Sequence, residues 1–340
     1  MRRKSNGIFR PLMIAIIIII IINFIKLPYY VTRPGMATEL EPIVEVENGY
    51  EEEGSFSLTT VRIGRANPFT YLSAQFNKYH EIFPVAQVKQ EGESDAEYLT
   101  RQIHLMETSQ DAAIAIAYTK AGKKVEYRHQ GVYITFVMEG MPGEGKLKAG
   151  DRVFKADDKE LTTAEEFIAY VGEKSAGDEV AVTYKRDGKE NTVSLTLAPF
   201  PNDPERAGVG ISLVTDSEVV VDPKVTLKTE DIGGPSAGLM MSLEIYNQLV
   251  EEDITKGQKI AGTGTINSNG EVGPIGGISQ KIVAADKAGA SIFFAPNEKG
   301  KSRSNYEIAI EAARDIDTKM KVVPVDTFDD ALHFLMKKHQ

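Results

Sequence analysis

The sequence contains no cysteine among its 340 residues. This absence excludes disulfide bonds, thiolate catalysis and thiolate metal sites. Positive charge is also in deficit, because 39 Lys and Arg stand against 49 Asp and Glu, a formal net charge of -10. A chain this acidic is not expected to bind nucleic acid. The pattern Gly-x-x-x-x-Gly-Lys-[Ser/Thr] is missing as well. We therefore expect no P-loop and no cofactor.

Histidine is scarce, with five in the chain. His80 and His104 stand alone, without the spacing that metal ligands need, so no metal site is predicted. No Ser-His-Asp arrangement is visible either. If the chain carries a nucleophile, its base is expected to be another residue type.

The amino terminus holds the longest apolar stretch. Four basic residues precede the segment 12–25, which includes an unbroken isoleucine run. A membrane-spanning helix needs about 20 mostly apolar residues, and residues 8–27 roughly meet that length. Tyr29 and Tyr30 would then lie at the interface between membrane and water. The alternative is a cleaved signal peptide, but no small-x-small site follows closely. We predict a transmembrane signal anchor in residues 1–31, with the amino terminus cytoplasmic and the rest extracytoplasmic.

The remaining chain divides at changes of pattern and is long enough for two or three domains. Residues 32–122 form a predicted segment with a long helix, 94–121, that begins with the capping-box residues Ser94 and Glu97. Residues 123–200 are rich in strand patterns. A proline-rich break at 199–204 then precedes residues 205–340, where strand and helix patterns alternate.

Two motifs stand out in residues 123–200. One is the turn Leu-x-x-Gly-Asp-x-Val at 147–153, and the other is the loop Gly131-Val132-Tyr133-Ile134. With the order of the elements, they make this module resemble a PDZ domain. The resemblance implies that the loop binds a peptide carboxylate while the next strand pairs with the peptide. A β-rich packing domain without a ligand is the alternative.

The candidate chemistry lies in Gly-Gly-Pro-Ser236-Ala237-Gly, between a strand pattern at 225–229 and an apolar helical run. Glycines permit tight backbone geometry there. The first N–H groups of a helix lack internal partners, so Ser236 and Ala237 could supply oxyanion donors beside a nucleophilic serine. Taken alone, the stretch is more simply interpreted as the start of a helix with Ser236 as its capping residue.

A second glycine-rich turn, Gly-Pro-Ile-Gly-Gly at 273–277, also leads into a helix, with Lys281 in its first turn. The positive end of the helix dipole and burial would both favour neutral lysine, the form that a general base requires. A solvated helix lysine is the simpler alternative for this residue alone.

Taken together, Gly-Pro-Ser-Ala-Gly and Gly-Pro-Ile-Gly-Gly-x-x-x-Lys, with Ser236 and Lys281 45 positions apart, resemble the proteolytic domain of Lon-type serine proteases. The whole arrangement resembles the membrane-anchored, PDZ-containing Lon-like proteases of Gram-positive bacteria. The resemblance implies that Ser236 is the nucleophile and Lys281 its base, with Thr263 orienting the lysine. Gly233 and Thr265 stand where Lon proteins carry acids, which puts regulation through those acids in doubt.

We therefore predict an α+β multidomain chain: a transmembrane helix, a PDZ-like β-rich module and a Lon-type proteolytic α/β domain. The predicted function is a serine endopeptidase that cleaves exported peptides or membrane and secreted proteins, without ATP. A homo-oligomeric ring follows from the resemblance alone. The main alternative is a PDZ scaffold with an inactive protease-like domain. A phosphate site at the glycine-rich helix starts is a weaker alternative, because the P-loop lysine is missing.

Overall fold

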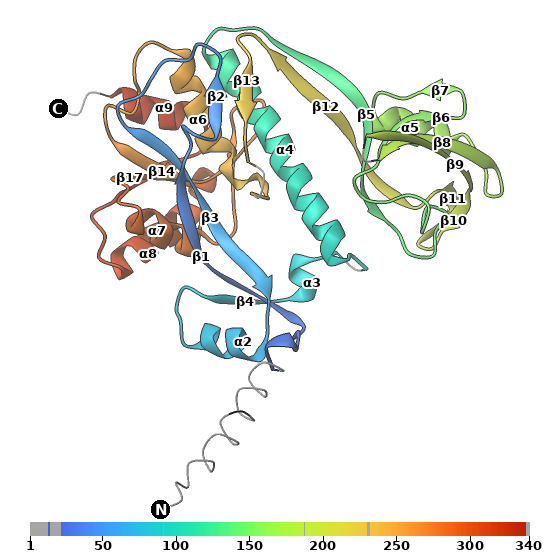
Figure 1. Cartoon of the computed structure of the whole chain (residues 1–340), viewed down its shortest axis with the longest axis horizontal. Coiled ribbons are helices and arrows are strands. Elements are labelled where there is room, and N and C mark those ends of the chain that lie inside the picture. The colour runs from blue at the N-terminus through green and yellow to red at the C-terminus, as the bar shows by residue number, and fades with distance from the viewer. Residues whose placement is uncertain (1–12, 14–21, 91, 187, 230–231, 338–340) are drawn as a thin grey trace, which may run out of the picture.

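A computed structural model describes residues 13, 22–90, 92–186, 188–229 and 232–337. A long helix, α4 (Asp95–Lys120), runs between a main sheet with its covering helices and a separate β-rich module (Figure 1). Two long strands extend from beside α4 into that module. The architecture therefore has two packed bodies joined by α4 and this strand pair.

The main sheet combines strands from both ends of the chain. Its order is β18-β17-β14-β3-β1-β4, with parallel pairing from β18 to β3 and antiparallel pairing of β1 with β3 and β4. The strands are β1 (Tyr29–Glu39), β3 (Ser55–Arg65), β4 (Glu81–Pro84), β14 (Lys259–Gly262), β17 (Ile292–Pro296) and β18 (Lys321–Val325). Residues 29–84, which the sequence separates from 205–340, thus supply three strands to one sheet.

Helices pack against this sheet and against each other. They are α2 (Pro68–Gln75), α3 (Val85–Val88), α4 (Asp95–Lys120), α6 (Gly238–Leu249), α7 (Ile278–Lys287), α8 (Asn305–Asp315) and α9 (Phe328–Met336). The 3-10 turns are η1 (Pro235–Ala237) and η2 (Glu298–Gly300). The capping box predicted at Ser94 and Glu97 is confirmed at the start of α4.

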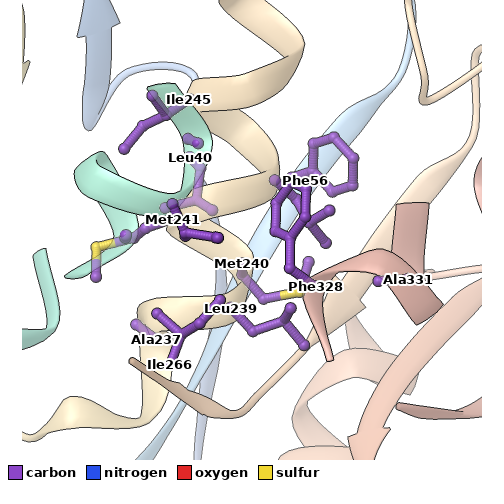
Figure 2. Close-up of a cluster of buried hydrophobic side chains, with 14 of the residues drawn as sticks. Leu40, Phe56, Ala237, Leu239, Met240, Met241, Ile245, Ile266, Phe328 and Ala331 are labelled. Carbon is purple, nitrogen blue, oxygen red and sulfur yellow. The ribbon is translucent and has the colours of Figure 1, made fainter. Parts of the chain in front are cut away.

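Helix α6 forms the centre of the largest core. Eleven of its 12 residues are buried, including four polar ones, Ser242, Glu244, Asn247 and Gln248. Leu239, Met240 and Met241 meet Leu40 and Phe56 from the N-terminal part and Phe328 and Ala331 from α9 (Figure 2). The helix that follows Ser236 is therefore fixed on all sides.

The β-rich module is a sheet of order β12-β5-β6-β8-β9, with β7 paired to β6 and α5 packed against it. Its elements are β5 (Val125–Val137), β6 (Arg152–Ala156), β7 (Lys159–Glu160), α5 (Ala164–Gly172), β8 (Glu179–Arg186), β9 (Lys189–Thr196) and β12 (Ile211–Val221). Small ladders join β2 (Val44–Val46) to β13 (Val225–Leu227), β10 (Ala198–Phe200) to β11 (Asp203–Gly208), and β15 (Thr265–Ile266) to β16 (Val272–Gly273).

The membrane anchor is the main correction. Most of the predicted span, residues 1–12 and 14–21, lies outside the described residues. Within the part that is described, no helix is both long and apolar enough to cross a bilayer. The end of the predicted segment is folded differently: Tyr30 and Val31 are buried in β1, and the Leu27 N–H donates to the Ala66 carbonyl at 2.8 Å. These findings contradict the predicted transmembrane fold and the single-pass location.

Candidate active site

The serine turn, residues 233–238, is held by α4. The Gly234 N–H donates to the Gln102 carbonyl at 2.8 Å, and the Ser109 hydroxyl donates to the Pro235 carbonyl at 2.9 Å. Gly234 has a φ of 88°, a left-handed conformation that favours glycine. The turn therefore presents Ser236, which is partly exposed, at the point where η1 passes into α6.

Lys281 comes from the first turn of α7, which packs against β1 and β3. The helix begins at Gly277, whose φ is 72°. A Cβ atom there would lie 2.6 Å from Val61 Cγ1 of β3. Glycine at this position lets the helix start approach the sheet closely enough for Lys281 to reach beneath the serine turn.

The lysine nitrogen has three oxygen neighbours. Lys281 Nζ lies 2.8 Å from Ser236 Oγ, 2.9 Å from Thr263 Oγ1 and 2.7 Å from the carbonyl oxygen of Thr59. Thr263 Oγ1 itself donates to the Ser236 carbonyl at 2.9 Å, so it accepts from the lysine. A neutral amine has two protons and one lone pair. With both protons given to Thr59 and Thr263, the lone pair is left for the Ser236 hydroxyl.

The surroundings favour that neutral form. Lys281 is only 2% exposed, and burial lowers its pKa to about 7. Burial disfavours the ammonium because a low-dielectric interior solvates charge poorly. At neutral pH a substantial fraction of the lysine can therefore accept a proton.

Three of the predicted site residues, Ser236, Thr263 and Lys281, thus lie within hydrogen-bonding distance of one another, and Ala237 is buried directly after the serine. Thr59 was missed. It lies in β3, 222 positions before Lys281, and its hydroxyl also donates to the Gly262 carbonyl at 2.9 Å. Its strand alternates like any half-buried strand, so the sequence held no signal for this role.

The predicted peptide loop Gly131-Val132-Tyr133-Ile134 lies inside β5. Val132 pairs with Thr215 of β12 on one side and with Val153 of β6 on the other. Both edges of the strand are therefore occupied at this position, and no peptide strand can add there. Within the described residues, the unpaired edge on this side of the sheet belongs to β12.

No metal centre accompanies this site in the described ranges, where no group of three or more His, Cys, Asp or Glu side chains is placed to hold an ion. A partly exposed hydroxyl beside a buried, deprotonable lysine is instead the arrangement of a serine hydrolase with a Ser-Lys dyad.

Family comparisons give the particular class. Residues 225–338 match the model of the Lon protease (S16) C-terminal proteolytic domain, and residues 114–197 match that of the PDZ domain. The chain thus combines a match to the PDZ domain with a match to the Lon proteolytic domain, so both resemblances are confirmed at the level of these domains. The predicted membrane anchor is not confirmed.

Individual relatives agree with this assignment. The Lon protease of Campylobacter concisus is 37% identical over 100 residues, 29% of this chain and 11% of the relative. The Lon protease of Mycoplasma mobile is 24% identical over 213 residues, which cover 52% of this chain and 25% of the relative. The chain thus spans a quarter or less of the length of these two relatives.

Two solved structures are similar to a quarter of the chain. A solution structure from Geobacillus thermodenitrificans is 42% identical, covering 25% of this chain and 98% of that one, with a TM-score of 0.23. The PDZ domain of an SdrC-like protein from Listeria monocytogenes is 32% identical. The match covers 26% of this chain and 90% of that domain, with a TM-score of 0.24.

Proposed function

We propose that this chain is a serine endopeptidase in which Ser236 is the nucleophile, Lys281 the general base and Thr263 a positioning residue. The observation that carries the proposal is the 2.8 Å contact between Ser236 Oγ and a buried lysine whose pKa is lowered to about 7. Thr59 joins the proposal as a second positioning residue, because its carbonyl accepts one of the two amine protons.

The proposed reaction is acyl transfer in two stages. Neutral Lys281 takes the hydroxyl proton as Ser236 Oγ attacks a peptide carbonyl, and the N–H groups of Ser236 and Ala237 stabilise the oxyanion. The lysine ammonium then protonates the leaving amine, which yields an acyl-serine ester. Water, deprotonated by Lys281, hydrolyses the ester and regenerates the serine.

We further propose that cleavage needs no ATP, because the 340 residues contain no P-loop sequence. The expectation of exported substrates depended on the membrane anchor and is withdrawn with it.

For the PDZ domain we propose that an extended peptide adds to the unpaired edge of β12, next to α5. The ring assembly stays a prediction, which native mass spectrometry of the full chain would test.

The central test is cleavage of an unstructured protein by the full chain without nucleotide. We expect Ser236→Ala and Lys281→Ala each to lower kcat by roughly 10⁴-fold, because both groups are needed in one proton transfer. Lys287→Ala, an exposed lysine of the same helix, is the matched control and should cleave like the unaltered chain. Cleavage that survives both dyad substitutions would eliminate this assignment.

A PDZ scaffold with an inactive protease-like domain remains the competing function. It would bind peptides through the PDZ domain and leave every one of them intact. The same incubation separates the two, provided that peptide binding is recorded in parallel with cleavage. Binding without any Ser236-dependent cleavage would favour the scaffold.

A further inference from the structure

A cavity of about 410 Å³ lies beside the serine turn. Its walls come from α4, Tyr127 of β5, residues 215–217 of β12, Pro235, and residues 266–268, which begin with the last residue of β15. Pro235, the neighbour of Ser236, forms part of the lining, together with Ser109, whose hydroxyl binds the Pro235 carbonyl. The volume falls in the range of pockets that hold a ligand side chain or a small molecule.

The cavity carries an excess of negative charge. Glu107, Asp111 and Asp216 all line it. Arg152 donates to Asp216 and lies 3.9 Å from Glu107. Asp111 accepts a hydrogen bond from the backbone of Val219, but no ion pair in the described part of the chain gives it a cation.

Asp111 therefore lies in an environment that disfavours its charge. Burial raises its pKa to about 6, and the nearby carboxylates of Asp216 and Glu107 add to the shift. A cation placed in the cavity would reverse both effects, because an opposite charge nearby stabilises a carboxylate.

His104 supplies a second, independent observation. Its ring lines the cavity, is 8% exposed and stacks on Tyr133 with centroids 3.8 Å apart. Among the described residues its buried Nδ1 has no hydrogen-bond partner, since the nearest carboxylate oxygen, of Glu107, is 3.6 Å away. Buried polar atoms normally have a partner, so this nitrogen is placed to accept a hydrogen bond from a donor that enters the cavity.

We propose that the cavity is the subsite that receives a lysine or arginine side chain of the peptide substrate, close to the scissile bond. The proposal rests on the peptidase function proposed above and names its substrate class. A metal ion does not fit, because the described carboxylates and histidine do not converge on one point. Since β12 supplies one wall, the subsite is complete only when the PDZ domain lies against α4.

The first test compares cleavage of matched peptides that differ only in one residue beside the scissile bond, lysine or its uncharged isostere norleucine. We expect the full chain to show kcat/KM about tenfold higher for the lysine peptide, the usual effect of one partly buried charge pair. Asp111→Asn should lower this ratio to about threefold or less, and Asp111→Glu should restore it. Asp158→Asn, a fully exposed carboxylate of the β6–β7 turn, is the charge-matched control and should keep the ratio.

A second test is independent of cleavage. In the Ser236→Ala chain, fluorescence anisotropy should show the lysine peptide bound about tenfold more tightly than the norleucine peptide, and Asp111→Asn should reduce the difference to about threefold or less. If Asp111→Asn fails to fold, Glu107→Gln replaces it, because this side chain is half exposed. Cleavage without lysine preference, or a preference that neither substitution changes, would overturn the subsite. Absence of all cleavage alongside selective binding would reject the peptidase and keep the subsite.

Discussion

At the scale of single residues, one buried lysine determines what the site can do. Its two amine protons are donated to the Thr59 carbonyl and the Thr263 hydroxyl. The lone pair then faces Ser236 without any rearrangement. In the proposed mechanism, no conformational change is therefore needed to prepare the base, and only the protonation state of Lys281 limits its use.

This gives a definite pH dependence. Burial lowers the Lys281 pKa to about 7, so the base is protonated below that pH and neutral above it. We expect kcat/KM to fall about tenfold per pH unit below pH 7 and to level off at alkaline pH. Initial rates with one uncharged peptide between pH 5 and 9 would measure the profile. A rate independent of pH over this range would contradict Lys281 as the base.

The core of this site could be predicted from sequence because its residues lie in two short motifs. Ser236 and Lys281 each follow a glycine-rich turn, and those turns impose the local geometry. Thr59 could not be predicted, because its contribution is a backbone carbonyl. Any residue type offers that group, and only the long-range packing of α7 against β3 brings it to the lysine.

At the scale of elements, α4 supports the serine turn from one side, and β15 with Gly264 just before it supports the turn from the other. The Gly264 N–H donates to the Ser236 carbonyl at 2.9 Å, while Ser109 of α4 binds the Pro235 carbonyl. The first residue of α6, Gly238, fits between these supports. A Cβ atom there would lie 2.6 Å from Ser109 Oγ and 2.9 Å from Ile266 Cγ2.

Gly238→Ala should therefore destabilise the protein, although alanine usually stabilises helices relative to glycine. We expect a loss of about 1–3 kcal/mol in the free energy of unfolding from overpacking, together with reduced kcat. Gly172→Ala in α5 is the matched control, because its Cβ would meet no atom within 4 Å. That variant should gain about 0.5 kcal/mol. Urea denaturation measures both, and equal effects would refute the packing argument.

The bounds of helices and strands were predicted better than the contacts that each of them makes. The 94–121 pattern became α4, but Leu99 and Ile103, which stand at the helical spacing typical of buried residues, are 58% and 40% exposed. Periodicity identifies the helix and does not reveal that its first half projects beyond the main body. Residues 211–221, which lie within the predicted domain 205–340, likewise form β12, which pairs with β5 of the PDZ domain. Strand pairing depends on long-range contacts that a local pattern does not contain.

At the scale of the whole molecule, the N-terminal part is built into the catalytic body. Besides supplying three strands of the main sheet, it places Glu52, just before β3, against α6. Asn247 Nδ2 donates to Glu52 Oε2 at 2.8 Å, and Gln248 Nε2 donates to Glu244 Oε1. The other oxygen of each carboxylate is buried without a hydrogen-bond partner among the described residues. Two carboxyl groups in one such interior are expected to share protons.

This pair should make the fold sensitive to alkaline pH. Burial raises the Glu244 pKa to about 8, with repulsion from Glu52 adding to the shift, and burial raises that of Glu52 to about 7. Because the folded pKa exceeds the unfolded value of 4.5, the stability is fully present below pH 4.5 and is lost as pH rises to about 8.

Glu244→Gln keeps a polar side chain of the same size beside Gln248 and removes the charge. It should therefore raise the free energy of unfolding by a few kcal/mol at pH 9 and by almost nothing at pH 4.5. Lys281 has the opposite linkage, since its lowered pKa makes stability rise between pH 7 and its unfolded value of 10.5. The Lys281 contribution is the same in the variant and in the unaltered chain, so it cancels when their free energies of unfolding are subtracted. The pH curve of each chain by itself still contains it. Urea titrations at pH 5, 7 and 9 would measure it, with Glu251→Gln, an exposed neighbour, as the control. A gain that is equal at all three pH values would show that packing, not proton binding, governs Glu244.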